Sequence, residues 1–145
     1  MTGVGPGQSP RGHRSLPHTG DLRVEAWART REECIVEAVR GMVGSFAELP
    51  PGASVVTREC VVSGDDDGRI LAAVLEEVIY RMDAADELPA DTTVTPEPGG
   101  VRVRFGMADS STATQTGAVP KAVAWHGLRL GRDAHGWACQ VTLDV

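Results

Sequence analysis

Two stretches of helical periodicity, set among stretches that alternate every second residue, limit this chain to a fold with two helices and several strands. In each stretch apolar residues recur at three- and four-residue steps, which is typical of an amphipathic helix with one buried face. The first stripe is Ile35, Ala38, Val39, Met42, Val43 and Phe46, and the second is Leu71, Val74, Leu75, Val78, Ile79 and Met82.

The boundaries of the first helix are marked by residues with known roles at helix ends. Thr30 and Glu33 have the spacing of a capping box, in which the hydroxyl accepts from a first-turn amide and the glutamate reaches back to the cap. The helix is expected to end before the Pro-Pro-Gly sequence at 50–52. Gly41 and Gly44 weaken it, and could let another element approach closely.

The acidic run at 65–67 precedes the second helix and raises the question of a calcium loop. Its carboxylates could bind calcium, but the glutamate at the twelfth position of an EF-hand is missing. Acidic residues are also favoured at a helix N-terminus by the positive end of the helix dipole. We therefore expect a helix start here, with the helix running to about Met82 or Ala85.

The remaining segments read as strands, at 22–27, 54–63, 92–95, 101–105, 121–130 and 136–145, with a polar loop at 109–117. In the segment 121–130 the alternation places five residues on one face, namely Ala122, Ala124, His126, Leu128 and Leu130. The order is strand, helix, strand, helix and then several strands. This order predicts an α+β fold, a two-layer sandwich with two helices packed on a mixed, largely antiparallel sheet.

The chain has 145 residues, which favours one domain. Residues 1–12 are rich in Gly, Pro, Ser and Gln and are interpreted as a disordered leader, with the domain at 13–145. The leader lacks the apolar run of a signal peptide and no later segment has the length of a membrane span, so a soluble, cytoplasmic protein is expected.

Charge and cysteine usage narrow the function classes. The net charge is -6, and a broad basic face for holding phosphates is therefore not expected. If RNA is involved, a partner holds it. Cys34, Cys60 and Cys139 have neither close pairing nor an even number, and are interpreted as reduced core thiols.

Two acidic positions at strand ends are the strongest candidates for chemistry. Asp21 ends the sequence LPHTGD before the first strand, and Asp144 lies beside the terminal Val145 at the end of the last strand. A side-chain carboxylate next to an α-carboxylate concentrates two anions, which a cation can offset, and calcium or magnesium prefers such oxygen ligands. From charge alone, a solvated terminus with an unrelated Asp21 is the more common arrangement.

Other motifs point to no enzyme class. The four histidines lack the close spacing of zinc ligands, and neither a G-x-S-x-G elbow nor a phosphate loop occurs. His126 is expected as a satisfied core or interface histidine, and Lys121 as a solvated cation at a strand end. His18 beside Asp21 is only suggestive of a site.

Four segments in register resemble the archease family, the small protein cofactors of RtcB-type RNA ligases. They are LPHTGDLRVEAWARTREECIVEA, GDDDGRILAAVLEEVIYRMD, VPKAVAWHGLRL and GWACQVTLDV. The resemblance covers roughly 13–145 and includes the last residue.

The resemblance implies that Asp21, Asp144 and the terminal carboxylate of Val145 bind a divalent metal, calcium or magnesium, while His18 and Thr19 shape the loop. Lys121 and His126 lie in a matching segment and could face the ligase. Family members are not ligases. They are thought to promote guanylylation of the ligase, and so its multiple turnover in tRNA splicing or RNA repair.

Three positions depart from the family pattern. Pro17 replaces an acidic residue, Gly20 replaces alanine and Ala124 replaces threonine, and loss of the acid at 17 could alter the metal site. Two other functions stay open, a small metal-dependent hydrolase using His18 and Asp21, and a chaperone-like binding module. The hydrolase predicts turnover by the isolated protein, and the binding module predicts little effect of mutating the carboxylates.

Overall fold

The computed structural model describes residues 9–18 and 20–145, without the side chain of His18. Within this part the elements follow in the order β1 (Gly12–His18), β2 (Asp21–Ala28), α1 (Arg31–Gly44), β3 (Ala47–Glu48), β4 (Val56–Ser63), α2 (Asp67–Ala85), β5 (Glu87–Glu97), β6 (Gly100–Asp109), a 3-10 helix (Ser110–Thr112), β7 (Thr114–Gln115), β8 (Ala122–Asp133) and β9 (Gly136–Asp144).

The strands form two main sheets and one small ladder. The four-stranded sheet has the order β1-β2-β9-β8, the three-stranded sheet has the order β4-β6-β5, and β3 pairs with β7. Every pairing between described strands is antiparallel. The centre of the larger sheet is therefore made by β2 and β9, which come from opposite ends of the chain.

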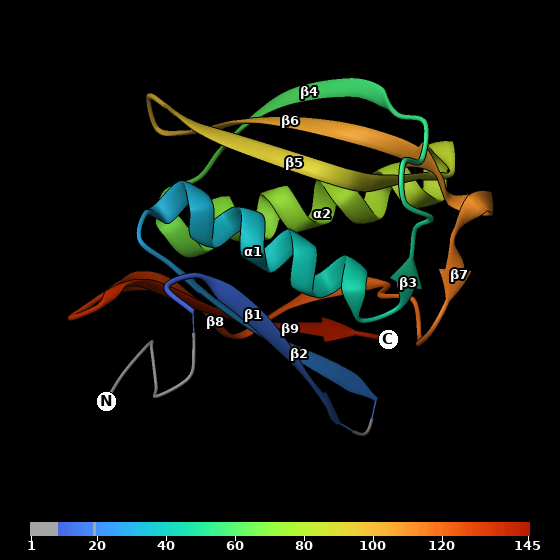
Figure 1. Ribbon diagram of the computed structural model, residues 1–145. Coiled ribbons are helices and arrows are strands. Elements are labelled where there is room, and N and C mark those ends of the chain that lie inside the picture. The colour runs from blue at the N-terminus through green and yellow to red at the C-terminus, as the bar shows by residue number, and fades with distance from the viewer. Residues whose placement is uncertain (1–8, 19) are drawn as a thin grey trace.

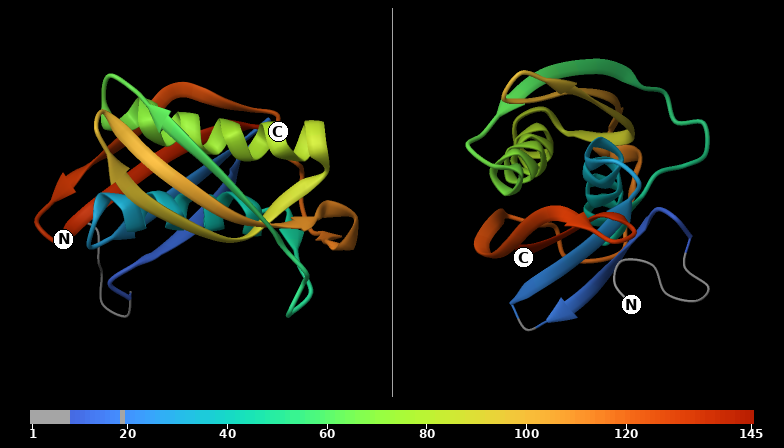
Figure 2. Two further views of the ribbon diagram at one scale, coloured as in Figure 1. Left: turned by 90° about the horizontal axis from the view of Figure 1, so that it is seen from above. Right: turned by 90° about the vertical axis from the view of Figure 1, so that its left-hand side faces the viewer.

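The two helices lie side by side between the two main sheets (Figures 1 and 2). The prediction of an α+β fold with two helices on largely antiparallel sheet is confirmed. The single sheet of that prediction is divided in two, so the sandwich has three layers and each helix buries two faces. This explains why the helices carry so many fully buried side chains, among them Ile35, Met42, Leu71, Leu75 and Val78.

Both predicted helix starts are confirmed by their caps. The Thr30 hydroxyl accepts from the amide of Glu33 at 3.1 Å, and the Asp66 carboxylate accepts from the amide of Arg69 at 2.9 Å. The acidic run therefore begins a helix, as expected, and α2 ends at Ala85.

The expected close approach at a glycine of the first helix is confirmed at one position. A Cβ added to Gly41 would lie 2.9 Å from Cγ1 of Val24 and 3.1 Å from Cβ of His13, whereas one added to Gly44 would meet nothing within 4 Å. Gly41 thus lets α1 lie directly against β1 and β2.

Three local predictions need correction. The segment GHRSLPH, which lies before the first predicted strand, itself forms a strand, β1. The loop expected at 109–117 contains a 3-10 helix and the short strand β7. In β8 the register shifts between Ala124 and Arg129, so Val123 and Leu130 are buried while Ala122 and His126 are exposed. The one-face alternation predicted for this strand is wrong because the irregularity breaks its period.

The predicted leader can be compared with the structure only in part, because residues 1–8 lie outside the described residues. The described residues of this segment contact the domain, since the main-chain oxygen of Ser9 accepts from Nε1 of Trp27 at 3.0 Å and Arg11 pairs with Glu33 and Glu37 of α1. The three cysteines are free, with Cys34 and Cys139 buried and Cys60 half-buried.

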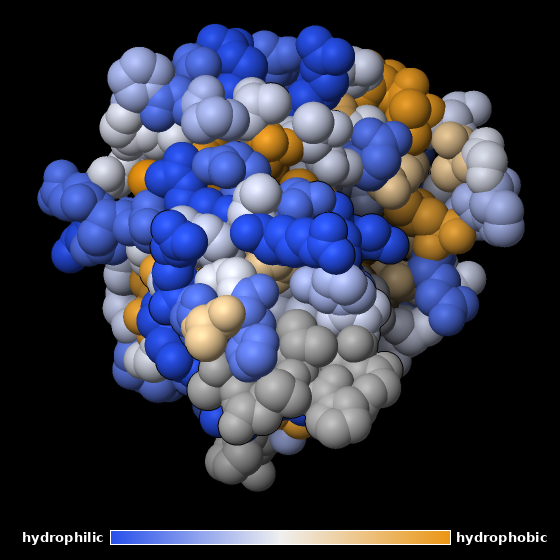
Figure 3. Space-filling view, turned by 60° about the vertical axis from the view of Figure 1, so that its left-hand side comes forward, coloured by the Kyte–Doolittle hydropathy of each residue, from blue (hydrophilic) through white to orange (hydrophobic). Residues whose placement is uncertain are grey.

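The described helices are each too short or too polar to cross a membrane. On the face shown in Figure 3 hydrophilic residues form a broad central band, and apolar residues gather mainly along one side.

Candidate functional site

Asp21 is positioned by a tight hairpin. His18 and Asp21 are paired at the closed end of the β1–β2 ladder, which leaves a two-residue connection of Thr19 and Gly20. Gly20 has φ of 76°, a left-handed conformation that favours glycine over alanine. An alanine at this position would be strained in the same conformation. Thr19 itself lies outside the described residues.

The register of the central strands places Asp21 directly opposite Asp144. Residues that flank a two-residue hairpin loop exchange both of their main-chain hydrogen bonds, so the main-chain groups of Asp21 are directed at His18. Asp21 and Asp144 are therefore a non-hydrogen-bonded pair, the closer kind, in which Cα atoms are about 4.5 Å apart. Two residues from opposite ends of the chain thus hold their carboxylates side by side.

The acidic pair lies on the outer face of the sheet. The neighbouring Leu22 and Leu143 are buried toward the helices, and side chains alternate along a strand. Asp144 is exposed and Asp21 is half-buried. Two carboxylates directly opposite each other repel, and a shared divalent cation would remove that repulsion.

The end of β9 is held on its other side by β8. The amide of Lys121 donates to the carbonyl oxygen of Asp144 at 2.7 Å, and Ala122 pairs with Asp144 in the ladder. Val145, which follows directly, is partly buried and packs against the core. The main chain that carries the Val145 oxygens is thus fixed next to the acidic pair.

The other predicted site residues lie at different places along β1 and β8. His18 lies opposite Asp21 in the backbone register, and Lys121 is exposed directly before β8, as expected of a cation at a strand end. His126 is exposed in the irregular part of β8, so the expectation of a core histidine is wrong, and the alternative of an interface histidine stays a prediction. Pro17 lies in β1, an edge strand, where a residue without an N–H is tolerated.

The oxygen atoms of Asp21, Asp144 and Val145 are the kind of ligand that a hard divalent cation prefers, but they are few in number. Asp21 and Asp144 offer carboxylate oxygens opposite each other in the ladder, and the main-chain carbonyl oxygen of Val145 follows directly in the chain. Among the side chains that the structure describes, no group of three or more His, Cys, Asp or Glu could hold a metal. A metal at this place therefore depends on Val145, or on water, to complete its coordination.

Sequence reasoning missed a buried ionic cluster that anchors β1. The side chain of Glu37 on α1 is 4% exposed, and it accepts from Nε of Arg11 at 2.7 Å and pairs with Nδ1 of His13 at 2.9 Å. Burial raises the pKa of Glu37, but the hydrogen bonds from His13 and Arg11 and the charge of Arg40 outweigh it, so its pKa lies below the ordinary value. The only sequence signal is a charged residue among the apolar residues of a predicted helix.

Fold and site together define a class: small α+β proteins with two helices between antiparallel sheets and an acidic pair at the end of the two central strands. The model of the archease protein family (MTH1598/TM1083) matches residues 13–145. This chain belongs to the archease family, as the four sequence segments predicted.

Known relatives agree in sequence and in fold. A probable protein archease of Mycobacterium tuberculosis is 52% identical over 140 residues, which cover 97% of this chain and 78% of the relative. Protein archease of Methanosarcina barkeri is 24% identical over 142 residues, covering 90% of this chain and 93% of the relative.

Two solved structures share the fold at 16% identity. The solution structure of protein 1598 of Methanobacterium thermoautotrophicum has a TM-score of 0.72 and covers 92% of this chain and 99% of its own. The crystal structure of an archease of Thermotoga maritima, described as a possible chaperone, has a TM-score of 0.62 and covers 90% and 94%. None of these descriptions states a catalysed reaction.

Proposed function

We propose that this protein is a non-catalytic activator of an RtcB-type RNA ligase, which promotes guanylylation of the ligase and its multiple turnover in tRNA splicing or RNA repair. The observation that carries the proposal is the pairing of Asp21 with Asp144 on the outer face of the sheet. Membership of the archease family supports it.

The acidic pair is the proposed metal site. Asp21 and Asp144 would hold calcium or magnesium, with the main-chain carboxylate of Val145 as a further ligand where the chain ends there. When bound, the metal supplies positive charge that can neutralise the phosphates of a nucleoside triphosphate. The protein's own part is to keep the two carboxylates adjacent on the outer face of the sheet, which the pairing of Asp21 with Asp144 supports.

The proposed partner is the ligase and not RNA. The chain carries a net charge of -6, so it suits a basic surface such as the active-site region of an RNA-binding enzyme. RNA would be met only through the ligase, in the cytoplasm.

The test is guanylylation of the cognate ligase by labelled GTP, with and without this protein. Wild type is compared with Asp21→Asn, with Asp144→Asn and with a form extended beyond Val145, which converts the terminal carboxylate to an amide. Asp83→Asn, at an exposed aspartate of α2, is the matched control. Circular dichroism establishes that all variants are folded, and calcium titration measures the metal site independently of the ligase.

We expect stimulation by wild type and by the control, and loss of both stimulation and calcium binding in Asp21→Asn, in Asp144→Asn and in the extended form. Retained stimulation in variants that no longer bind calcium would disprove the role of the metal. Turnover by the isolated protein would favour the hydrolase, and unchanged activity in every carboxylate variant would favour a binding module.

A further inference from the structure

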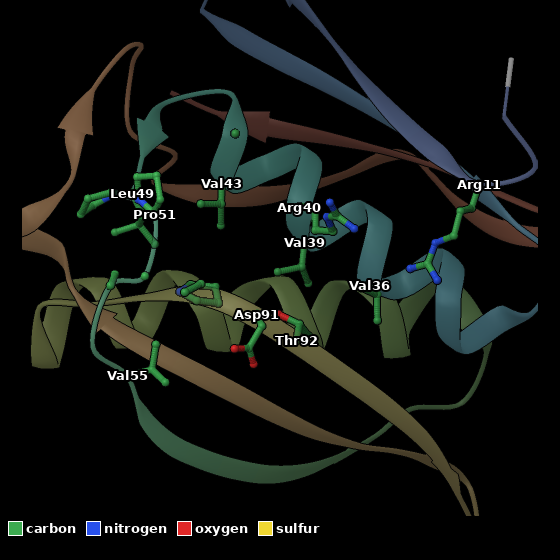
Figure 4. Close-up of a pocket in the computed structure, with 16 residues that line it drawn as sticks. Arg11, Val36, Val39, Arg40, Val43, Leu49, Pro51, Val55, Asp91 and Thr92 are labelled. Carbon is green, nitrogen blue, oxygen red and sulfur yellow. The ribbon is translucent and has the colours of Figure 1, made fainter. Parts of the chain in front are cut away.

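A second site lies away from the acidic pair, in a groove of about 920 Å³ between α1, the segment 49–55 and β5 (Figure 4). Its floor is apolar, formed by Val36, Val39 and Val43 along one side of α1. The opposite side is the beginning of β5. We propose that this groove binds an extended peptide that carries aliphatic side chains and an acidic residue, and that the peptide pairs with the open edge of β5.

The edge of β5 is available for strand pairing. In the order β4-β6-β5 it is an outer strand, and its one partner among the described strands is β6. Glu97 and Gly100 flank a two-residue loop, so the main-chain groups of Glu97 are hydrogen-bonded to β6. Along an antiparallel strand, successive residues direct their N–H and C=O groups to opposite sides. Thr92, Val94 and Pro96 therefore direct theirs away from β6.

The open part of the edge has defined ends. Pro96 has no N–H and cannot donate to an added strand, and the register shift between Pro89 and Asp91 interrupts the ladder at the other end. Between them Thr92 and Val94 offer their main-chain groups, and Thr92 lines the groove. A short extended segment, rather than a helix or a globular surface, is what such an edge accepts.

Apolar side chains of the peptide have partners in the groove wall. Val55 is 44% exposed, one of the few large apolar side chains so open to solvent, and Pro50 and Pro51 beside it are also exposed. A peptide strand presents every second side chain to one side, so alternate aliphatic residues would lie against Val36 and Val55. Burying these side chains supplies a driving force.

The charge of the groove selects an acidic residue in the peptide. Arg40 projects from α1 with its side chain 63% exposed, and its contact with Glu37 is long, at 3.5 Å. Arg11 is held by Glu33 and Glu37. Among the described residues, Asp91 is the one carboxylate that lines the groove. Its side chain lies over Gly106 of β6, where an added Cβ would be 2.6 Å from a carboxylate oxygen. Arg40 is thus a cation facing the groove of an otherwise acidic protein.

The test starts from a displayed library of random dodecapeptides selected on the full chain. Enriched peptides are synthesised with fluorescein, and their affinity is measured by anisotropy. Each of two groove variants has a matched control outside the groove. Val55→Asp is compared with Val61→Asp, because Val61 on β4 is 52% exposed. Arg40→Glu is compared with Arg104→Glu, because the side chain of Arg104 on β6 is 66% exposed.

We expect the enriched peptides to carry aliphatic residues at alternate positions and at least one acidic residue. Each groove variant should bind them about fivefold or more weakly than wild type, and each control variant should bind within about twofold of wild type. Selection on Arg40→Glu should enrich basic residues instead. Hydrogen exchange at the amides of Thr92 and Val94 should slow when the peptide binds.

Several results would overturn the proposal. They are failure to enrich any peptide, equal effects of groove and control variants, or protection of β4 in place of β5. Dimers in light scattering that Arg40→Glu dissociates would assign the groove to a second copy of the chain. The proposal does not depend on the acidic pair, so Asp144→Asn should leave peptide affinity unchanged.

Discussion

Replacing the buried Glu37 by glutamine should destabilise the protein measurably at neutral pH. The substitution keeps the size of the side chain but removes the charge that Arg11 and His13 bond, at 2.7 and 2.9 Å. A hydrogen bond to a charged group contributes about 1.5–3 kcal/mol, and the amide oxygen can still accept from one donor. We therefore expect the free energy of unfolding to fall by about 2 kcal/mol, or the Tm by about 4–8 °C for a domain of this size.

The pH dependence of this loss has a definite sign. The pKa of Glu37 is lowered in the folded protein, so its ionised form adds stability above the ordinary glutamate pKa, about 4.3. That stability disappears as the pH falls through the folded pKa, where wild type also becomes neutral at this position. The difference between wild type and Glu37→Gln should therefore shrink below about pH 4.

Urea unfolding followed by circular dichroism, at pH values from 7 down to 3, measures both effects. Glu33→Gln is the matched control, because Glu33 also pairs with Arg11, at 2.9 Å, but its side chain is 42% exposed. An exposed pair of this kind contributes about 1 kcal/mol or less. A difference for Glu37→Gln that is below about 0.5 kcal/mol at pH 7, or that stays constant to pH 3, would refute the reasoning.

Further substitutions test other parts of the fold. Gly41→Ala should destabilise by about 1–3 kcal/mol because its Cβ meets β1 and β2, whereas Gly44→Ala should stabilise by up to about 1 kcal/mol, and thermal melts compare the two. Asp66→Ala removes the cap of α2 and should cost about 1 kcal/mol in urea unfolding, with Asp65→Ala as control. Arg31→Met should cost about 1.5–3 kcal/mol, because this half-buried guanidinium links the start of α1 to Asp67 at 2.9 Å and to the β5–β6 turn; an unchanged Tm would contradict it.

The elements best predicted from the sequence are those whose local pattern agrees with their burial. Both helix starts have caps and both predicted apolar stripes pack into the core, although each helix also buries a second face. In β9, Cys139, Val141 and Leu143 are buried at every second position, as in a strand with one face on the core. β1 was missed because it is an edge strand with few apolar residues, anchored by Arg11 and His13 through α1. Its partners lie on another element, which no local pattern can indicate.

The candidate site was predictable only in part. Local reasoning found Asp21 and Asp144 as acidic residues at strand ends, but it could not decide whether they meet, because that depends on the pairing of distant strands. The family resemblance implied the pair, and the β2–β9 register places the two residues opposite each other. The groove beside Arg40 could not be predicted, since its walls come from three separate segments.

The pairing of β2 with β9 also has a consequence for how the chain acquires its structure. The strands at the centre of the larger sheet are separated by more than one hundred residues, so this sheet cannot be completed until β9 has been synthesised. Pairing over such a separation is slow compared with the formation of the β1–β2 hairpin or the helices. A growing chain would carry Asp21 on its hairpin while Asp144 is still absent. The acidic pair would thus arise in the last stage of folding, and an incomplete chain could not present it.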